Sequence, residues 1–145
     1  MSDASIGPLG EDEMDAVYSL LRAVSLPVQG LDAHGDTILV ARRGEDVVGS
    51  VALEVYEDGA LLRSLAVAES ERGRGLGIEL TQAAIALARA RGVPVVVLLT
   101  ETAAEFFPRF GFETVSRADV PAGVRGSVEF TTVCPDTAVV QALTP

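Results

Sequence analysis

The sequence predicts an α+β fold, in which helices lie on both faces of a mixed, mostly antiparallel central sheet. Three observations support this class. Three hairpin-connected, β-branched runs occupy residues 36–67. An alanine-rich stretch with helical periodicity follows at 78–92, and a continuous apolar run follows at 94–100. This order of hairpins, helix and strand is typical of a layered sheet with helices packed on it.

The N-terminal segment, residues 5–26, is predicted to form a short strand, a turn and an amphipathic helix. Acidic residues at 11–13 favour the first helical turn electrostatically, and Pro27 and Gly30 end the helix. The apolar positions share one broad helical stripe: Met14, Val17, Tyr18, Leu20, Leu21 and Val24.

The antiparallel ribbon consists of strands at 37–43, 47–56 and 60–67. The first two strands are separated by the turn Gly-Glu-Asp and the last two by the turn Glu-Asp-Gly. Each strand is rich in β-branched or aliphatic residues, which favour a pleated sheet.

The second half of the chain begins with the clearest helix, at 78–92, whose last residue is a glycine stop signal. The continuous apolar run 94–100 is typical of a strand buried on both faces. A short helix at 102–110, a strand at 113–118 and two β-like runs within 127–143 complete the prediction.

Length and composition predict one domain over residues 1–145, with 48% apolar residues. No apolar run reaches the ~20 residues of a membrane span, and the first residues lack a signal peptide's pattern, so we expect a cytoplasmic protein. The single cysteine excludes an intramolecular disulfide, and its distance in sequence from the single histidine argues against a zinc site.

The charge distribution points to a small anionic ligand rather than to nucleic acid. The net charge is −10, which opposes binding to a phosphate backbone. Residues 1–60 carry 12 acids and 3 arginines, whereas residues 61–112 carry 5 acids and 6 arginines. There is no lysine, so neither a Schiff base nor a nucleotide P-loop is available. We therefore expect an anion to bind in the near-neutral middle of the chain.

The segment Glu-Arg-Gly-Arg-Gly-Leu-Gly, residues 71–77, lies in that middle, between a strand and the strongest helix. Its glycine spacing does not fit the dinucleotide fingerprint. One interpretation is an ordinary glycine-rich turn. The other is an anion site, because unpaired amides at a helix start and flanking arginines suit a pyrophosphate.

This segment and its neighbours resemble the acyl-CoA site of the GNAT superfamily of N-acetyltransferases. The superfamily's pattern, Arg/Gln-x-x-Gly-x-Gly/Ala after a strand ending in Leu-x-Val, is met by Arg72, Gly75 and Gly77 after residues 65–67. A second family element, a short helix ending in Gly-Phe, is present at 103–112. The order of elements matches over nearly the whole chain, which implies an α/β/α layered GNAT fold.

The resemblance implies how acetyl-CoA binds. The amides of residues 72–77 hold the pyrophosphate, and the open strand edge at 65–67 pairs with the pantetheine arm. The acetyl carbonyl then lies near the amides of this edge, which stabilise an oxyanion. The cofactor-binding residues so implied are Leu65, Ala66, Val67, Arg72, Gly73, Arg74, Gly75, Leu76, Gly77, Thr100 and Phe107.

Glu54 is the candidate general base for the attacking amine. Strand alternation places Ala52, Glu54 and Tyr56 on one face. A carboxylate flanked by apolar residues is expected to have a raised pKa. The alternative is a solvated strand face.

Arg63 is the candidate for binding a substrate carboxylate through its planar guanidinium. The same alternation places it on the face of Leu65 and Val67. The alternative is a structural ion pair with Glu54. Both residues are therefore predicted as catalytic-site residues.

Phe107 is a departure from the family pattern. It occupies the position, four residues before the glycine of Gly-Phe, where the family often has a tyrosine that protonates the leaving thiolate. The replacement is Thr100, Ser64, Tyr56 or a water, or the thiolate leaves unassisted. The phenylalanines of this region are otherwise typical of core packing.

A narrower resemblance is to the GNAT proteins that occur with arsenic-resistance genes, and it rests on phrases within 53–67, 98–112 and 129–140. Arsenite is typically held by two or three thiolates, and this chain has one cysteine, so we expect Cys134 to be a buried structural residue. We expect His34 to be a loop residue. The GNAT domain of glutamate N-acetyltransferases shares the segments Arg-Ser-Leu-Ala-Val, residues 63–67, and Arg-Gly-Arg-Gly, residues 72–75.

The sequence therefore predicts an acetyl-CoA-dependent N-acetyltransferase that acts on a small amine by direct attack. The acceptor is predicted to be amino-acid-like or an organoarsenical. A homodimer is common in the family and is a further expectation. The alternative function is a CoA-binding module without turnover, which acts as a sensor or regulatory partner.

Overall fold

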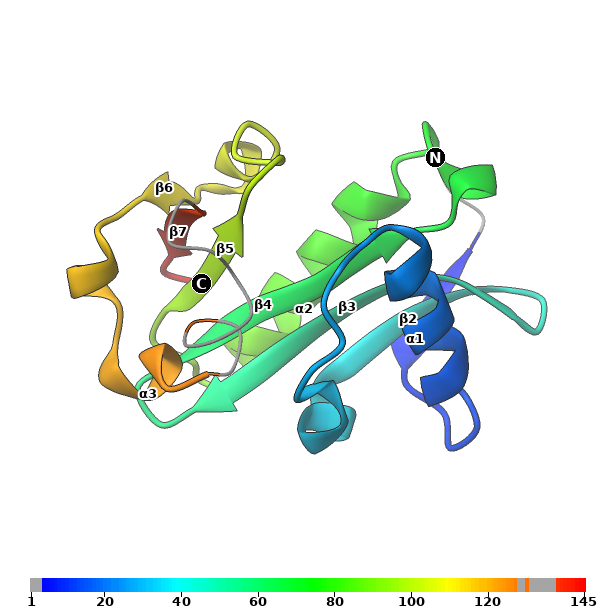
Figure 1. Cartoon of the computed structure of the whole chain (residues 1–145), viewed down its shortest axis with the longest axis horizontal. Helices are drawn as coiled ribbons and strands as arrows, with labels where there is room; N and C mark the ends of the chain where they lie inside the picture. The colour runs from blue at the N-terminus through cyan, green and yellow to red at the C-terminus, as the bar shows by residue number, and fades with distance from the viewer. Residues whose placement is uncertain (1–3, 128–129, 131–137) are drawn as a thin grey trace.

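The computed structural model describes residues 4–127, 130 and 138–145. Its core is one seven-stranded sheet of strand order β1-β2-β3-β4-β5-β7-β6, in which only β4 and β5 pair in parallel (Figure 1). The predicted mixed, mostly antiparallel sheet is thus confirmed. The strands are β1 (Ser5–Pro8), β2 (Ile38–Arg43), β3 (Asp46–Tyr56), β4 (Gly59–Val67), β5 (Val96–Thr100), β6 (Glu113–Thr114) and β7 (Val139–Leu143).

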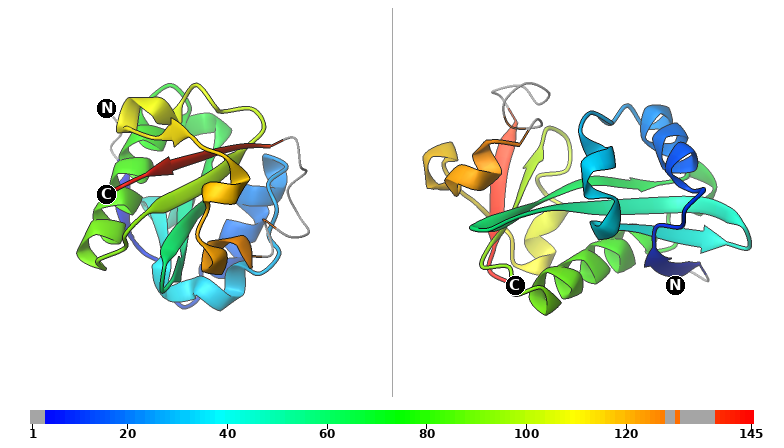
Figure 2. Two further views of the ribbon diagram at one scale, coloured as in Figure 1. Left: turned by 90° about the vertical axis from the view of Figure 1, so that its left-hand side faces the viewer. Right: turned by 90° about the horizontal axis from the view of Figure 1, so that it is seen from below.

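Helices cover both faces of the sheet, as Figure 2 shows edge-on. Helix α2 (Leu76–Ala90) packs on one face, where Gly49 of β3 allows close approach, since a Cβ there would lie 2.8 Å from Leu80. The opposite face carries α1 (Met14–Ala23), the 3-10 helix η1 (Leu31–Thr37) and the short α3 (Ala122–Arg125). The predicted stripe of α1 faces the sheet, with Val17 and Leu21 fully buried.

Strands β4 and β5 diverge soon after they meet. Their parallel pairing consists of Ala60↔Val96 and Leu61↔Val97, and Figure 1 shows β5 leaving β4 at an angle beyond that point. Buried valines and leucines at the start of β5 fix the junction, in line with its continuous apolar sequence. The rest of the β4 edge toward its carboxyl end therefore faces a gap instead of a paired strand.

A bulge in β4 changes which face Arg63 occupies. Ala52 pairs with Arg63 and Ser50 with Ala66, so β4 has one residue more than β3 across this interval. Ser64 has a φ of 60°, and Ser50 Oγ donates a hydrogen bond to its carbonyl at 2.8 Å. The prediction that Arg63 shares a face with Leu65 and Val67 is wrong, because the bulge interrupts the alternation.

Two predicted elements are shorter than expected. The helix predicted at 102–110 is only a 3-10 turn, η3 (Phe107–Phe110), because Pro108 removes an amide and disfavours helical backbone before it. The strand predicted at 113–118 is reduced to β6, since a 3-10 turn, η4 (Arg117–Asp119), begins three residues after it. The first of the two β-like runs in the tail falls largely outside the described residues.

The sequence contains no apolar run long enough to predict a membrane-spanning segment. Among the residues that the structure describes, no helix has the length and apolar content that crossing a bilayer requires.

Candidate active site

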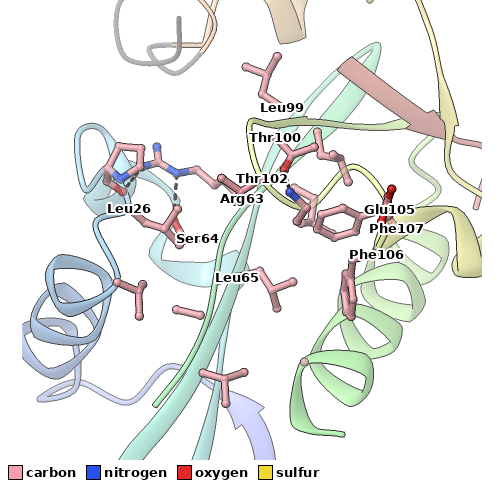
Figure 3. A pocket seen from close by; sticks show the side chains of 18 of the residues that line it. Leu26, Arg63, Ser64, Leu65, Leu99, Thr100, Thr102, Glu105, Phe106 and Phe107 are labelled. Atoms are coloured by element: carbon pink, nitrogen blue, oxygen red, sulfur yellow. Dashed lines mark hydrogen bonds between the residues drawn. The ribbon is translucent and has the colours of Figure 1, made fainter. Parts of the chain in front are cut away.

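A cavity of about 720 Å³ lies where β4 and β5 diverge (Figure 3). Its floor is formed by β4 and β5, and its walls by the loop after α1, by the start of α2 and by η3. The residues that line it are Val24, Leu26, Pro27, Leu62, Arg63, Ser64, Leu65, Ala66, Val67, Arg72, Gly77, Leu98, Leu99, Thr100, Thr102, Ala103, Glu105, Phe106, Phe107 and Arg109.

The predicted cofactor edge borders this cavity. Leu65, Ala66 and Val67 all line it, and they lie beyond the last residue of β4 that pairs with β5. A strand edge next to an open cavity can pair with an extended ligand chain through main-chain hydrogen bonds. That a pantetheine arm occupies this edge stays a prediction.

The glycine loop forms a second hollow, of about 220 Å³, beside the cavity. Gly73 and Gly75 have φ values of 83° and 81°, and Gly75 is the N-cap of α2. No atom lies within 4 Å of a Cβ built on either residue, so backbone conformation and not space requires glycine. Alternating backbone of this kind points amides at one place, next to the unpaired amides of a helix start.

Most of the predicted loop residues meet at this hollow. It is lined by Val67, Glu71, Arg72, Gly73, Gly75, Leu76, Gly77, Ile78 and Phe106. Arg72 and Gly77 also line the larger cavity, so the two spaces adjoin at the loop. Arg74 is exposed and lines neither space.

Phe107 lines the cavity as part of an aromatic wall. It offers no hydroxyl, unlike the tyrosine that the family often has at this position. Phe107 is 6% exposed and makes edge-to-face contacts with Phe106 and Phe112, at centroid distances of 5.0 and 5.8 Å. It therefore both packs in the core and lines the cavity. The phenylalanine cluster is the packing arrangement that the sequence also suggested.

Two of the hydroxyls considered as replacements for the missing tyrosine line the cavity. Thr100 Oγ1 accepts a hydrogen bond from the Ala103 amide at 2.9 Å, and the Ser64 hydroxyl accepts one from Arg63 Nε at 3.1 Å. Tyr56 does not line the cavity. Thr100 and Ser64 are thus the two of these groups that a bound ligand reaches.

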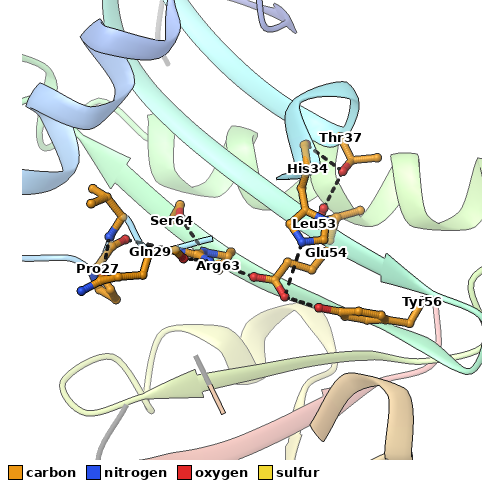
Figure 4. A network of polar contacts seen from close by, with 10 residues as sticks. Pro27, Gln29, His34, Thr37, Leu53, Glu54, Tyr56, Arg63 and Ser64 are labelled. Atoms are coloured by element: carbon orange, nitrogen blue, oxygen red, sulfur yellow. Dashed lines mark hydrogen bonds and ion pairs between the residues drawn. The ribbon is translucent and has the colours of Figure 1, made fainter. Parts of the chain in front are cut away.

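Arg63 and Glu54 form a buried ion pair, with 2.8 Å between Nη1 and Oε2 and both side chains 1% exposed (Figure 4). Arg63 also donates to the carbonyls of Gln29, at 2.7 Å, and Pro27, at 3.2 Å. The guanidinium therefore ties the loop after α1 to β4. This matches the alternative considered from the sequence, a structural pair.

The electrostatics of Glu54 differ from the sequence expectation. Burial pushes its pKa upward, but hydrogen bonds from Ser127, Tyr56 and Arg63, together with the charge of Arg63, outweigh burial and hold the pKa below its ordinary value. The predicted raised pKa is wrong, because the apolar strand neighbours are not what surrounds the carboxylate. Glu54 also does not line the cavity.

Two partners of Glu54 were not singled out as a cluster by the sequence. The Tyr56 hydroxyl donates to Glu54 Oε1 at 2.5 Å, and burial followed by this hydrogen bond raises the pKa of Tyr56 to about 12. His34 lies at a kink inside η1, where its own backbone is not helical (φ −121°, ψ 28°), and its Nε2 is 3.8 Å from Glu54 Oε1. The shared strand face of Glu54 and Tyr56 was a usable signal, whereas His34 is 20 residues away with no pattern to connect it. Cys134 lies outside the described residues.

Solved structures with the same fold cover nearly all of the chain. N-acetylglutamate synthase from Neisseria gonorrhoeae, complexed with coenzyme A and N-acetyl-glutamate, matches with a TM-score of 0.85 and 20% identity over 99% of this chain. This chain spans only 35% of that synthase. Rv2747 from Mycobacterium tuberculosis, in complex with CoA, matches with a TM-score of 0.82 and 22% identity, over 97% of this chain and 99% of that one.

A third structure, the ribosomal-protein-S18-alanine N-acetyltransferase from Escherichia coli, has a TM-score of 0.74 and 20% identity, with 97% of this chain and 93% of that chain covered. Comparison with curated protein sequences found no match. The narrower resemblance to arsenic-resistance proteins has no support in these relatives. The family model of the acetyltransferase (GNAT) domain matches residues 34–114, which is more than half of the chain, so the chain belongs to the GNAT acetyltransferase family.

Proposed function

We propose that this chain transfers the acetyl group of acetyl-CoA to the primary amine of a small, amino-acid-like molecule by direct attack in a ternary complex. One observation carries the proposal. The β4 edge at Leu65–Val67 leaves β5, borders a cavity of about 720 Å³, and leads to the glycine loop at the start of α2. An extended thioester with a pyrophosphate at one end fits such a groove.

The residues present fit acetyl-CoA. The open space at Gly73 and Gly75, and their left-handed backbone, make a cradle in which amides can meet a pyrophosphate. Arg72 lines both the cradle and the cavity, so it adds a charge-assisted contact. The edge at Leu65–Val67 would receive the pantetheine arm. We assign cofactor binding to these residues.

Bound acetyl-CoA would supply a thioester, at which attack by a neutral amine forms a C–N bond and breaks the C–S bond, and the proton that the nitrogen loses passes to the departing thiolate. The amides of the β4 edge would stabilise the negative charge that develops on the carbonyl oxygen. Ser64 and Thr100 are the hydroxyls that we assign to proton transfer to the thiolate, directly or through water. Phe107 contributes an apolar wall beside them.

Glu54 and Arg63 have a positioning role in this proposal. Pro27, whose carbonyl Arg63 binds, lines the cavity together with Leu26, so the pair holds one wall of the acceptor space. The sequence predicted two other roles, a general base for Glu54 and a carboxylate clamp for Arg63. The pH dependence of kcat tests the role of Glu54. If Glu54 is the base, E54Q removes the acidic limb of the kcat profile; if it positions the loop, the limb stays and kcat falls at every pH.

An amino-acid-like acceptor is supported by the fold match to the gonococcal synthase, whose complex contains N-acetyl-glutamate. Arg109 also lines the cavity and offers a cation for an acceptor carboxylate. The arsenic link and the homodimer predicted from the resemblance stay predictions.

The test is calorimetric binding of acetyl-CoA, followed by a thiol-release assay over the proteinogenic amino acids and simple amines. We expect binding, and turnover with at least one amino acid above the rate with water. No binding at millimolar acetyl-CoA would refute the proposal.

The alternative, a CoA-binding module without turnover, is favoured by Phe107, which lacks the acid that the family resemblance implies. Tight binding together with no thiol release for any amine is the result that would establish it.

A further inference from the structure

Glu71 is an acidic side chain at a place prepared for an anion. It directly precedes the glycine loop, its side chain is 5% exposed, and it is among the residues that line the hollow of that loop. A carboxylate next to a bound pyrophosphate is destabilising unless a cation compensates it. The loop therefore contains a charge conflict that some other element must resolve.

Arg43, at the end of β2, resolves it. Its Nε donates to Glu71 Oε2 at 2.9 Å and its Nη2 to Oε1 at 2.6 Å, which is a two-bond fork across 28 residues of sequence. These hydrogen bonds, opposed by burial and assisted by the charges of Arg43 and Arg74, hold the pKa of Glu71 below its ordinary value. The carboxylate is thus ionised at neutral pH and engaged on the side of β2.

We propose that Arg43 is a positioning residue of the CoA site, which neutralises Glu71 and holds it so that the glycine loop presents only amides and arginines to the pyrophosphate. The inference rests on the proposed function. When Arg43 is lost, the freed carboxylate of Glu71 would repel the pyrophosphate or pair with Arg72, the loop arginine that lines the hollow.

The neighbouring residue, Arg42, provides a matched control. It makes the same kind of fork with Glu13 at the start of α1, with Nε 2.6 Å from Oε2 and Nη2 bonded to Oε1. Neither Arg42 nor Glu13 lines the cavity or the hollow. R42Q and R43Q therefore remove comparable ion pairs from adjacent positions of one strand, and only the second touches the loop.

The experiment is calorimetric titration of CoA into the wild type, R42Q, R43Q, E71Q and R43Q/E71Q at low salt. We expect R43Q to weaken CoA binding about tenfold and R42Q to bind as the wild type does. E71Q should lose less affinity for CoA than R43Q does, and the double variant should bind CoA more tightly than R43Q does. Since repulsion is screened, the gap between R43Q and the wild type should narrow at 0.5 M salt.

A purely structural role of the pair predicts another pattern, in which R43Q and E71Q lose affinity equally and the double variant is no better. That pattern, or an R43Q affinity equal to the wild type, overturns the inference while leaving the proposed function intact. If R43Q does not fold, the comparison of E71Q and the double variant with the wild type still decides: a tenfold loss in both overturns the inference. Failure of the wild type to bind CoA would instead refute the proposed function.

Discussion

The two ends of the cavity are built in different ways. At the glycine-loop end, one continuous segment, residues 72–77, forms the hollow, and its shape depends on the left-handed backbone of Gly73 and Gly75. At the other end, Arg63 and Glu54 combine with the carbonyls of Pro27 and Gln29, so three separate elements meet through side chains. The first end depends on backbone angles, and the second on a buried charge pair.

This difference teaches how each end should fail. A backbone site is lost when a residue cannot adopt the required φ, and the rest of the fold is little affected. A buried pair is lost with a cost to the whole protein, because the remaining charge stays desolvated. Perturbations of the two ends should therefore separate ligand affinity from stability.

The largest expected effect is on stability, from Arg63→Met. Removing one partner of a buried pair costs about 3–5 kcal/mol of unfolding free energy, since Glu54 would remain at 1% exposure without its guanidinium. Urea unfolding followed by circular dichroism measures it. The double variant R63M/E54Q should lose less unfolding free energy than R63M does. A loss below about 1 kcal/mol in R63M would break the distinction between the two ends.

Next in size is a loss of affinity from Gly75→Glu. A left-handed φ costs a side-chain-bearing residue about 1–2 kcal/mol, and the added carboxylate repels the pyrophosphate, so CoA should bind at least ~100-fold more weakly. The control is Gly44→Glu in the β2–β3 turn, where φ is 64° and no atom lies within 4 Å of a Cβ. Calorimetry should show normal CoA binding in this control; equal losses in both would point to global damage.

A smaller effect is expected from Phe107→Tyr, which adds a hydroxyl between the two ends. Phe107 lines the cavity at the position where the family resemblance implies an acid, so kcat should rise up to about tenfold. The KM for acetyl-CoA should stay constant, because the pyrophosphate cradle is untouched. Steady-state thiol release measures both constants. An unchanged kcat would mean that Ser64, Thr100 or water already suffices.

The smallest expected effect is a change of stability at alkaline pH, through Tyr56 beside the Arg63–Glu54 pair. The folded-state pKa of Tyr56 is raised to about 12 from an ordinary value of 10.0, by burial and then by its bond to Glu54. A raised pKa gives stability that is present below about pH 10 and is lost as pH rises toward 12. Tyrosinate absorbance of the wild type should contain a step near that pKa, and Y56F should lack it. The same titration in Y18F should retain it.

The fold was largely predictable because its signals are local. The stripe of α1, the alternation of β3 and the apolar run of β5 each appear within one segment, and all three elements formed as expected. Two elements were shorter than predicted because turn-forming residues compete with periodicity. Pro108 limits η3, and Ser116, whose side chain accepts from the Ala118 amide, starts η4 soon after β6.

The candidate site likewise has one part with a local signal in the sequence and other parts without one. Glycine spacing and flanking arginines pointed to the loop at 72–77, because a left-handed backbone leaves its mark on residue type. The bulge at Ser64 left no such mark, since neither Ser64 nor Leu65 is glycine, and so the face of Arg63 could not be predicted. His34 beside Glu54 and Arg43 on Glu71 lie 20 and 28 residues from their partners, without a periodic signal to connect them.

By itself, the sequence determined most of the order of helices and strands, the position of the glycine loop and the family to which the chain is similar, because these depend on short-range patterns of residue type. Only the tertiary structure decided which charges meet: Arg63 with Glu54, and Arg43 with Glu71. The physical reason is that an ion pair depends on strand register and on bulges, which are set by packing across the whole sheet and not by neighbours in the chain.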